Sequence, residues 1–192
     1  MSERIGVIVN PASGQGRGTR LLPDVRAAFA AVGVRDDDIR LSAAPGDELN
    51  VATRAIAEGC TTLVAVGGDG TWSNVANAIL RTGADCRLAI VSAGSGNDFV
   101  KSLGRDVPAS DLPRTARLAV DGPDTRIDVG RVEEWYFVNA MGFGFDAAVL
   151  DDAARLTWPR GRLVYFYSAL RQLFGYQGID VATNGGPHER YL

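Results

Sequence analysis

The chain has 192 residues, 46% of them hydrophobic, and a formal net charge of −3 at pH 7. This length and composition suit one globular domain, or one and part of another, with a buried core. The small negative charge argues against broad nucleic-acid binding, which needs a basic face. Two cysteines are too few for a disulfide scaffold or a zinc cluster, and no signal-peptide pattern opens the sequence, so we expect a cytoplasmic protein.

Strand and helix patterns alternate along the first part of the chain. Residues 4–10 predict a buried first strand, and the apolar spacing over 19–32 predicts a helix. The stretch "RDDDI" at 35–39 is expected to be a solvated loop. The next expected elements are a strand at 38–42, a helix between Asp47 and Gly59, a strand at 62–66, a helix at 71–81 and a strand at 87–91. This alternation predicts an α/β fold with a parallel sheet and helices on both faces.

The pattern changes near Asp124. Residues 125–132 and 134–145 predict two antiparallel strands, and residues 161–174 predict an amphipathic helix. The few strands expected in this part bury too little surface for a complete domain. We therefore expect an α/β domain at 1–124 and, at 125–192, the beginning of a β-rich second domain that is truncated here.

Three glycine-rich loops follow predicted strands. They read "NPASG" at 10–14, "GGDGT" at 67–71 and "AGSGND" at 93–98. Because the carboxyl ends of parallel strands meet at one edge of a sheet, these loops are expected to converge on a single crevice. Glycines let backbone N–H groups approach an anion closely, and a following helix adds the partial positive charge of its N-terminus. The three loops together predict a phosphate-binding site.

Polar side chains accompany the glycines. Asn10 can bond the turn backbone, and Ser13, Thr71 and Ser95 can offer hydroxyls to phosphate. No Walker lysine motif occurs, and no dinucleotide fingerprint is followed by a ribose-binding acid, which disfavours hydride transfer. The expected ligand is therefore a phosphate chain rather than a nicotinamide cofactor.

Asp69 is the acid within the second glycine loop. A carboxylate beside phosphate is repelled unless it serves a cation or takes a proton. Asp69 therefore suits a magnesium ligand, direct or through water, or the base for an attacking hydroxyl. A local cap in a tight strand-to-helix turn is the alternative, and this loop alone leaves both interpretations open.

The motifs "NPASG", "GGDGT", "GSGNDF" and "FVNAMGFGFDAAV" resemble the catalytic region of the diacylglycerol kinase and sphingosine kinase family, closest to its bacterial lipid-kinase branch. The resemblance runs from residue 4 to about residue 183. It implies a nucleotide-binding α/β domain like that of NAD kinases and diacylglycerol kinases, followed by a β-rich domain. It also implies ATP and Mg²⁺ as cofactors, with transfer of the γ-phosphoryl group to a hydroxyl of diacylglycerol or a similar lipid.

Two other functions stay open at this point. NAD kinases carry a similar glycine loop, so a kinase for a soluble nucleotide is one alternative. A nucleotide-binding module without catalytic activity is the other. We expect ATP and a lipid with a free hydroxyl as partners, and no nucleic acid. The basic and aromatic residues at 155–167 allow peripheral contact with a membrane surface, and unpaired strand edges allow a homodimer.

By motif, the resemblance assigns residues to the nucleotide, with Ser42 only loosely aligned. The expected cofactor-binding set is Asn10, Pro11, Ser13, Gly14, Ser42, Gly67, Gly68, Gly70, Thr71, Asn74, Gly94, Ser95, Gly96 and Asn97, and Asp69 is the expected catalytic and magnesium-linked residue. Where the family usually reads GGDGT-x-Asn-Glu, this chain has Ser73 and Asn74, so an amide replaces a carboxylate. The resemblance places further magnesium ligands and the acid proposed to activate the acceptor beyond Leu192.

Overall fold

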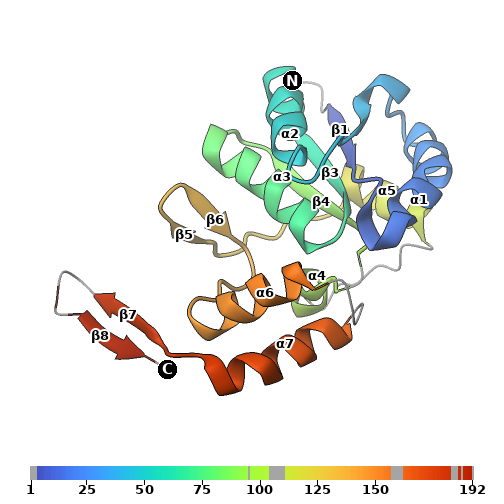
Figure 1. The fold of residues 1–192 in the computed structure, drawn as a ribbon. Coiled ribbons are helices and arrows are strands. Elements are labelled where there is room, and N and C mark those ends of the chain that lie inside the picture. Colours follow the sequence, from blue (N-terminus) through green and yellow to red (C-terminus); the bar gives the residue numbers. More distant parts are fainter. Residues whose placement is uncertain are drawn as a thin grey trace. The chain divides into compact units, whose positions relative to one another are not determined.

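The computed structural model describes residues 4–94, 96–103, 111–156, 162–182, 186 and 188–191. The chain divides into two compact units, one ending at Asn139 and one beginning at Ala140. In chain order, the elements of the first unit (Figure 1) are β1 (Ile5–Val9), α1 (Ser13–Ala30), the short 3-10 helix η1 (Asp36–Asp38), β2 (Ile39–Leu41), α2 (Glu48–Ala57), β3 (Thr62–Gly67), α3 (Asp69–Thr82), β4 (Arg87–Ser92), α4 (Asp98–Ser102), α5 (Leu112–Asp121), β5 (Gly130–Val132) and β6 (Trp135–Phe137).

A four-stranded parallel sheet lies at the centre of this unit, which confirms the predicted α/β fold. Its strand order is β2-β1-β3-β4. Val9 at the end of β1 lies opposite Val66 of β3, and Val66 lies opposite Val91 of β4. The three strands therefore end at the same level, and the loops that follow them leave from one edge of the sheet.

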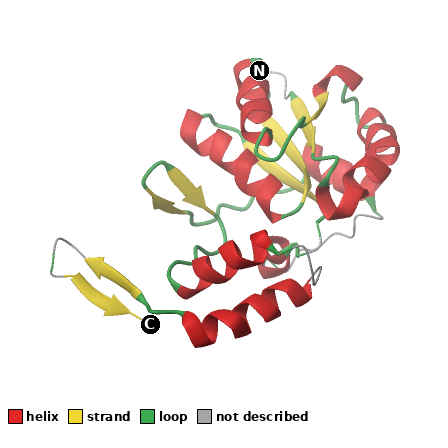
Figure 2. Cartoon of the chain, in the orientation of Figure 1, coloured by secondary structure: helices red, strands yellow, loops and turns green. Residues whose placement is uncertain are grey.

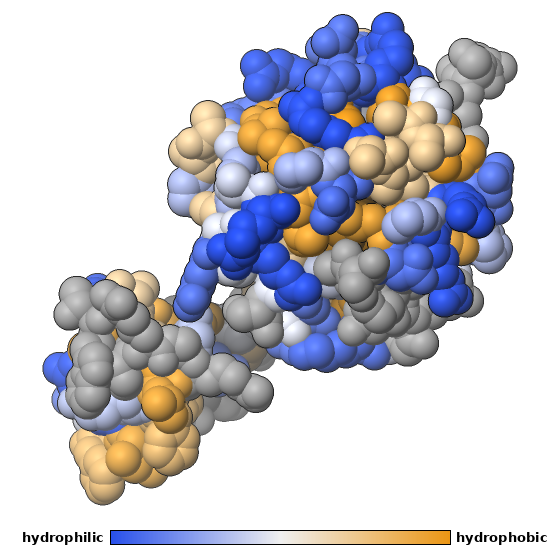
Figure 3. All heavy atoms as spheres, turned by 90° about the vertical axis from the view of Figure 1, so that its right-hand side faces the viewer, coloured by the Kyte–Doolittle hydropathy of each residue, from blue (hydrophilic) through white to orange (hydrophobic). Residues whose placement is uncertain are grey.

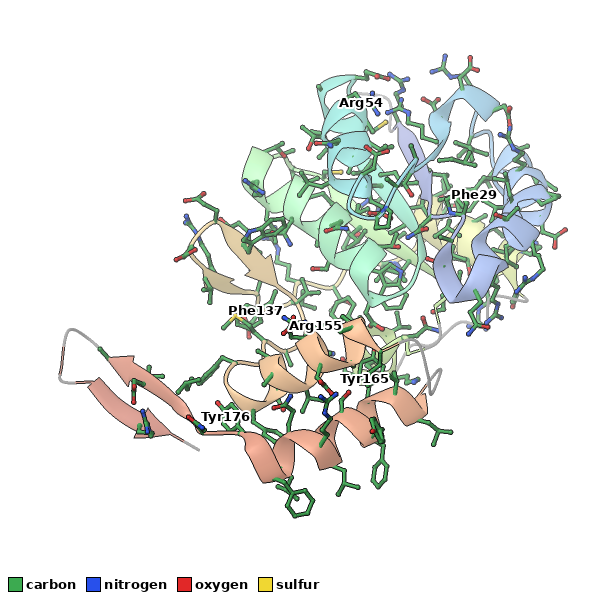
Figure 4. The ribbon with its side chains drawn as sticks, viewed as in Figure 1. Phe29, Arg54, Phe137, Arg155, Tyr165 and Tyr176 are labelled. Carbon is green, nitrogen blue, oxygen red and sulfur yellow. The ribbon has the colours of Figure 1, made fainter. Side chains whose placement is uncertain are left out.

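The two central strands, β1 and β3, bury both of their faces because helices cover the sheet on each side (Figures 1 and 2). Val7 and Val9 point into a core shared with α1 and α5, which includes Phe29 (Figure 4). Ile8, between those two valines, points into the opposite core with α2 and α3, where Trp72 is fully buried. Alternate side chains of a strand point to opposite faces, so each apolar strand fills two cores.

Two helices begin earlier than the sequence predicts. The α1 segment starts at Ser13, although Gly14, Gln15 and Gly16 have left-handed backbone angles that separate its first residues from the regular helix. α3 starts at Asp69, where the sequence predicts a start at Thr71. The second glycine loop is therefore short, and its acid and its threonine belong to the first turn of a 14-residue helix.

The β5–β6 hairpin groups with the first unit. Its antiparallel strands are paired as predicted, with Gly130 opposite Phe137. The buried Asn77 side chain of α3 donates to the backbone oxygen of Tyr136 at 2.8 Å and accepts from its backbone nitrogen at 2.9 Å. Arg81 of α3 also lies 5.2 Å from the centre of the Trp135 ring. By contacts the hairpin belongs with α3, whereas a domain boundary after residue 124 stays a prediction.

The second unit contains two helices and one hairpin among its described residues. They are α6 (Phe145–Arg155), α7 (Arg162–Gly175), β7 (Ile179–Ala182) and β8 (His188–Tyr191). The sequence predicts α7 but not α6. The two helices are joined by an ion pair of 3.1 Å between Arg171 and Asp152, and Phe145 packs edge-on against Tyr176 (Figure 4).

The apolar stripe predicted for α7 is exposed within this unit. Phe166 and Phe174 are 71% and 85% exposed, and Leu163 and Leu170 are also exposed. Hydrophobic residues (orange) likewise reach the surface between hydrophilic ones (blue) on the face of the molecule that Figure 3 shows. No described helix is both long and apolar enough to cross a membrane. The tryptophan and arginine at 158 and 160, part of the stretch that allows contact with a membrane surface, lie outside the described residues.

The acidic run at 36–38 contains a buried residue, so the prediction of a solvated loop is wrong for Asp38. This carboxylate is 3% exposed and accepts from Arg4 at 2.7 Å and from Arg35 at 2.9 Å. Burial alone raises the pKa of Asp38, but the hydrogen bonds from Arg35 and Arg4 outweigh it and hold that pKa below its usual value. Asp38 therefore joins the residue before β1 to the segment before β2.

Replacing Asp38 by asparagine is expected to lower the free energy of unfolding at pH 7 by about 1–3 kcal/mol, because two arginines lose their charged acceptor. A carboxylate whose pKa is lowered by folding contributes stability above its unfolded pKa of about 3.9. That contribution is lost as pH falls through the folded pKa. Urea unfolding should therefore show a gap between wild type and D38N that shrinks below about pH 4, whereas D37N, at an exposed neighbour, should show no such gap.

Candidate functional site

The first glycine loop is joined to the third helix by its polar side chains. Asn10 follows β1, and its Oδ1 accepts from the backbone nitrogen of Ala12 at 3.0 Å. Its Nδ2 donates to the Oγ1 of Thr71 at 3.1 Å. The Ser13 hydroxyl lies 3.5 Å from the same Thr71 oxygen. Thr71 is buried, so its hydroxyl links the two loops as well as lying at the start of a helix.

Glycines allow the third loop to touch the other two. A Cβ atom on Gly14, which has a φ of +56°, would lie 2.2 Å from the backbone oxygen of Ala93. A Cβ atom on Gly94 would lie 2.5 Å from the Cα of Gly68. Any side chain at these positions would push the loops apart. The predicted convergence of the loops is therefore seen in their backbones.

Asp69 connects the second loop to the third. Its Oδ2 accepts from the backbone nitrogen of Asn97 at 2.9 Å, and its Oδ1 accepts from that of Phe99 at 3.2 Å. A carboxylate that accepts from two amides at a helix start holds that segment in place. Asp69 therefore caps the start of α4 and not its own helix, which differs from the local cap that the loop sequence allows. Its role as a magnesium ligand or base stays a prediction.

Asn97 adopts a left-handed backbone with a φ of 57°. Its Nδ2 donates to the backbone oxygen of Gly94 at 3.1 Å. Its Oδ1 is buried without a hydrogen-bond partner among the described residues. Burying a hydrogen-bond acceptor without a partner costs free energy. Such a group is commonly paired with an ordered water or with a donor on a ligand.

The three loops line one open pocket of about 300 Å³, which we call the glycine-loop cavity. It is lined by Asn10, Ser13, Gly14, Gly68, Asp69, Gly70, Thr71, Gly94 and Gly96. The first helical hydrogen bond of α3 runs from the nitrogen of Trp72 to the oxygen of Gly68, so the preceding N–H groups have no helical acceptor. These amides and the helix dipole of α3 suit an anion. The cavity therefore fits a phosphate chain.

Not all of the predicted residues line this cavity. The carbonyl of Pro11 accepts from the backbone and the hydroxyl of Thr19, which makes it part of the α1 start. Gly67 lies behind the cavity, where a Cβ atom would meet the Thr71 side chain at 2.3 Å. Asn97 borders the cavity through Gly94. Ser95 lies outside the described residues.

Ser42 and Asn74 come together at a carboxylate that the sequence does not single out. Glu48 is 1% exposed and accepts from the Ser42 hydroxyl at 3.3 Å and from Asn74 Nδ2 at 3.0 Å. The sequence predicts Leu49, Ala52 and Ile56 inward on this helix. Ala52 is buried and Ile56 packs partly buried against the same core, and the buried face also includes Glu48 and Val51. The sequence feature that could have drawn attention to Glu48 is its place at the polar start of α2, directly after a Gly-Asp pair.

Comparisons with known proteins agree with this fold. Residues 4–132 match the diacylglycerol kinase catalytic domain family. A diacylglycerol kinase of Mycobacterium tuberculosis is 31% identical over 175 residues, which cover 88% of this chain and 55% of the relative. A diacylglycerol kinase of Bacillus subtilis is 28% identical over 180 residues, with 93% and 58% covered.

A solved structure of a diacylglycerol kinase from Bacillus anthracis is also similar. It has a TM-score of 0.57 and 28% identity, and the match covers 71% of this chain and 50% of that one. The fold and the glycine-loop cavity define an α/β protein whose glycine-rich loops meet at one edge of a parallel sheet. The chain belongs to the diacylglycerol kinase catalytic domain family. It spans just over half the length of the curated relatives named above.

Proposed function

We propose that this chain carries the nucleotide-binding part of an ATP-dependent lipid kinase, a phosphotransferase that acts on an alcohol acceptor. The bond between the γ-phosphorus and its bridging oxygen to the β-phosphate breaks. A bond forms between the γ-phosphorus and a hydroxyl oxygen of diacylglycerol or a similar lipid, and the hydroxyl proton passes to a base. The supporting observation is the convergence of three glycine loops on one cavity at the carboxyl edge of the sheet.

Phosphoryl transfer asks the protein mainly for positioning and for neutralisation of charge. The first-turn amides of α3 would hold phosphate oxygens, and the Ser13 hydroxyl would donate to the chain of phosphates. Asp69 supplies the carboxylate among the described lining residues of the cavity. Each carboxylate oxygen of Asp69 has a lone pair besides the one that accepts from a backbone N–H. Asp69 would therefore contact Mg²⁺ bound with the triphosphate, or act as a base. No group of three or more described His, Cys, Asp or Glu residues forms a metal site.

The proposal is tested by nucleotide binding and by product analysis. Calorimetry should show that the 192-residue protein binds ADP and ATP, while transfer by this stretch alone should be slow. With diacylglycerol, sphingosine and NAD offered together, phosphorylated lipid is the expected product. Phosphorylated NAD would instead identify a soluble nucleotide kinase. Nucleotide binding with no transfer to any acceptor, also when the protein continues into a full second domain, would identify a silent binding module.

A further inference from the structure

A buried carboxylate joins three segments next to the glycine-loop cavity. Glu48 Oε1 accepts from Ser42, and Oε2 accepts from the backbone nitrogen of Gly46 at 3.1 Å and from Asn74 Nδ2 at 3.0 Å. Ser42 follows β2, and its nitrogen donates to the oxygen of Val9, so it lies at the same sheet edge as the loops. All three donors to Glu48 are neutral groups. The carboxylate is therefore held by hydrogen bonds from neutral partners.

This contact fixes which way the Asn74 amide faces. A carboxylate can only accept, so the nitrogen of the amide must face Glu48. The Oδ1 of Asn74 therefore points away from Glu48 as an acceptor. Asn74 lies four residues after Gly70, which lines the cavity, and so about 6 Å further along the axis of α3. A group attached to phosphates at the start of α3 would come within reach of this acceptor.

We propose that Glu48 is a positioning residue that orients Asn74 to accept a hydrogen bond from the nucleoside part of the bound nucleotide. This inference rests on the proposed function. The donor is a ribose hydroxyl or the amino group of the base. Glu48 acts through its acceptor geometry, and its negative charge is not what matters. The contact with the nucleoside therefore depends on two residues. Asn74 on α3 accepts the hydrogen bond, and Glu48 on α2 orients the Asn74 amide.

Two matched variants separate geometry from charge. In E48Q the carbonyl oxygen can still accept from Gly46 and Asn74, and the new amino group can donate to the Ser42 hydroxyl. E48Q is expected to keep ADP affinity within about threefold of wild type. E48D keeps the charge but withdraws the oxygens by one methylene, and it is expected to lose about tenfold in ADP affinity. Loss in E48Q together with full affinity in E48D would overturn the proposal.

A double-mutant cycle tests the path through Asn74. E48M and N74L should each weaken ADP binding by about tenfold, and the double variant should be no weaker than N74L. Pyrophosphate, which fills only the glycine-loop cavity, should bind wild type and E48M alike. A general structural defect in E48M would weaken the binding of both ADP and pyrophosphate, and that result would overturn the proposal. Losses of ADP affinity that add up in the double variant would also overturn it. If E48M does not fold, the comparison of E48Q with E48D decides.

Nucleotide analogues identify the donor. Calorimetry with 2′-deoxy-ADP, 3′-deoxy-ADP and inosine diphosphate removes each candidate donor in turn. Wild type should discriminate against one of them, and E48D should not. Equal binding of ADP and all three analogues by wild type would show that Asn74 accepts from none of these groups. If wild type binds pyrophosphate but not ADP, or neither ligand, the proposed function fails, and this inference fails with it.

Discussion

Replacing Asp69 by alanine is expected to reduce ADP affinity by about 100-fold or more. Asp69 accepts from the backbone nitrogens of Asn97 and Phe99, so alanine leaves two amides without their charged acceptor. Each hydrogen bond to a charged group contributes about 1.5–3 kcal/mol. Without them the third glycine loop is no longer held against the second, and the cavity for phosphate loses one wall. The loss should appear in calorimetry with ADP, and the free energy of unfolding should also fall.

The same variant separates an anchoring role from a metal-binding role. If Asp69 anchors the loops, D69A weakens ADP binding in EDTA as well as in Mg²⁺. If Asp69 acts only as a magnesium ligand, the variant binds metal-free ADP as wild type does, which would contradict the anchoring role. D69N retains one acceptor oxygen and should fall between D69A and wild type. D85N is a suitable control because Asp85 is exposed before β4, away from the cavity.

Replacing Gly94 by alanine is expected to weaken nucleotide binding strongly while the sheet stays folded. The new Cβ atom would lie 2.5 Å from the Cα of Gly68 and 2.8 Å from the Oδ1 of Asn97. Real Cβ atoms do not approach backbone atoms so closely, so the loops must separate at a cost of about 1–3 kcal/mol. Calorimetry should then show ADP affinity lower by up to about 100-fold.

Gly175→Ala is the matched control for this substitution. A Cβ atom at Gly175 meets nothing within 4 Å, and Gly175 lies at the end of α7. This variant should bind ADP as wild type does. Circular dichroism should show the same helix content in both variants, since the cores on the two faces of the sheet are untouched. Wild-type ADP affinity in G94A would show that the second and third loops are not in close contact.

The sheet and its glycine loops could be predicted because their signals are local. Apolar runs such as residues 62–66 read as strands, and the glycines after them mark turns at one edge. The partners of Asp69 could not be predicted, because Asn97 and Phe99 are 28 and 30 residues away in sequence. The sequence limits Asp69 to a few roles, and its contact with the third loop depends on the packing of β3 beside β4.

The sequence also did not predict which polar residues are buried. Glu48 and Asp38 look like surface acids in the sequence, but each is buried with its own donors. Their burial depends on arginines or amides that come from other segments of the chain. Similarly, the sequence does not indicate that the Asn77 side chain pairs with the backbone of Tyr136, yet that pairing attaches the hairpin to α3. Long-range hydrogen bonds of this kind are set by the tertiary fold.

The proposed function requires that the backbones of three separate loops hold one triphosphate. A crystal structure of the protein with Mg²⁺ and a non-hydrolysable ATP analogue tests it most directly. The predicted result is phosphate oxygens about 3 Å from the amide nitrogens of Gly70 and Thr71, inside the glycine-loop cavity. A nucleotide bound outside that cavity, or one whose phosphates touch none of the three loops, would contradict it.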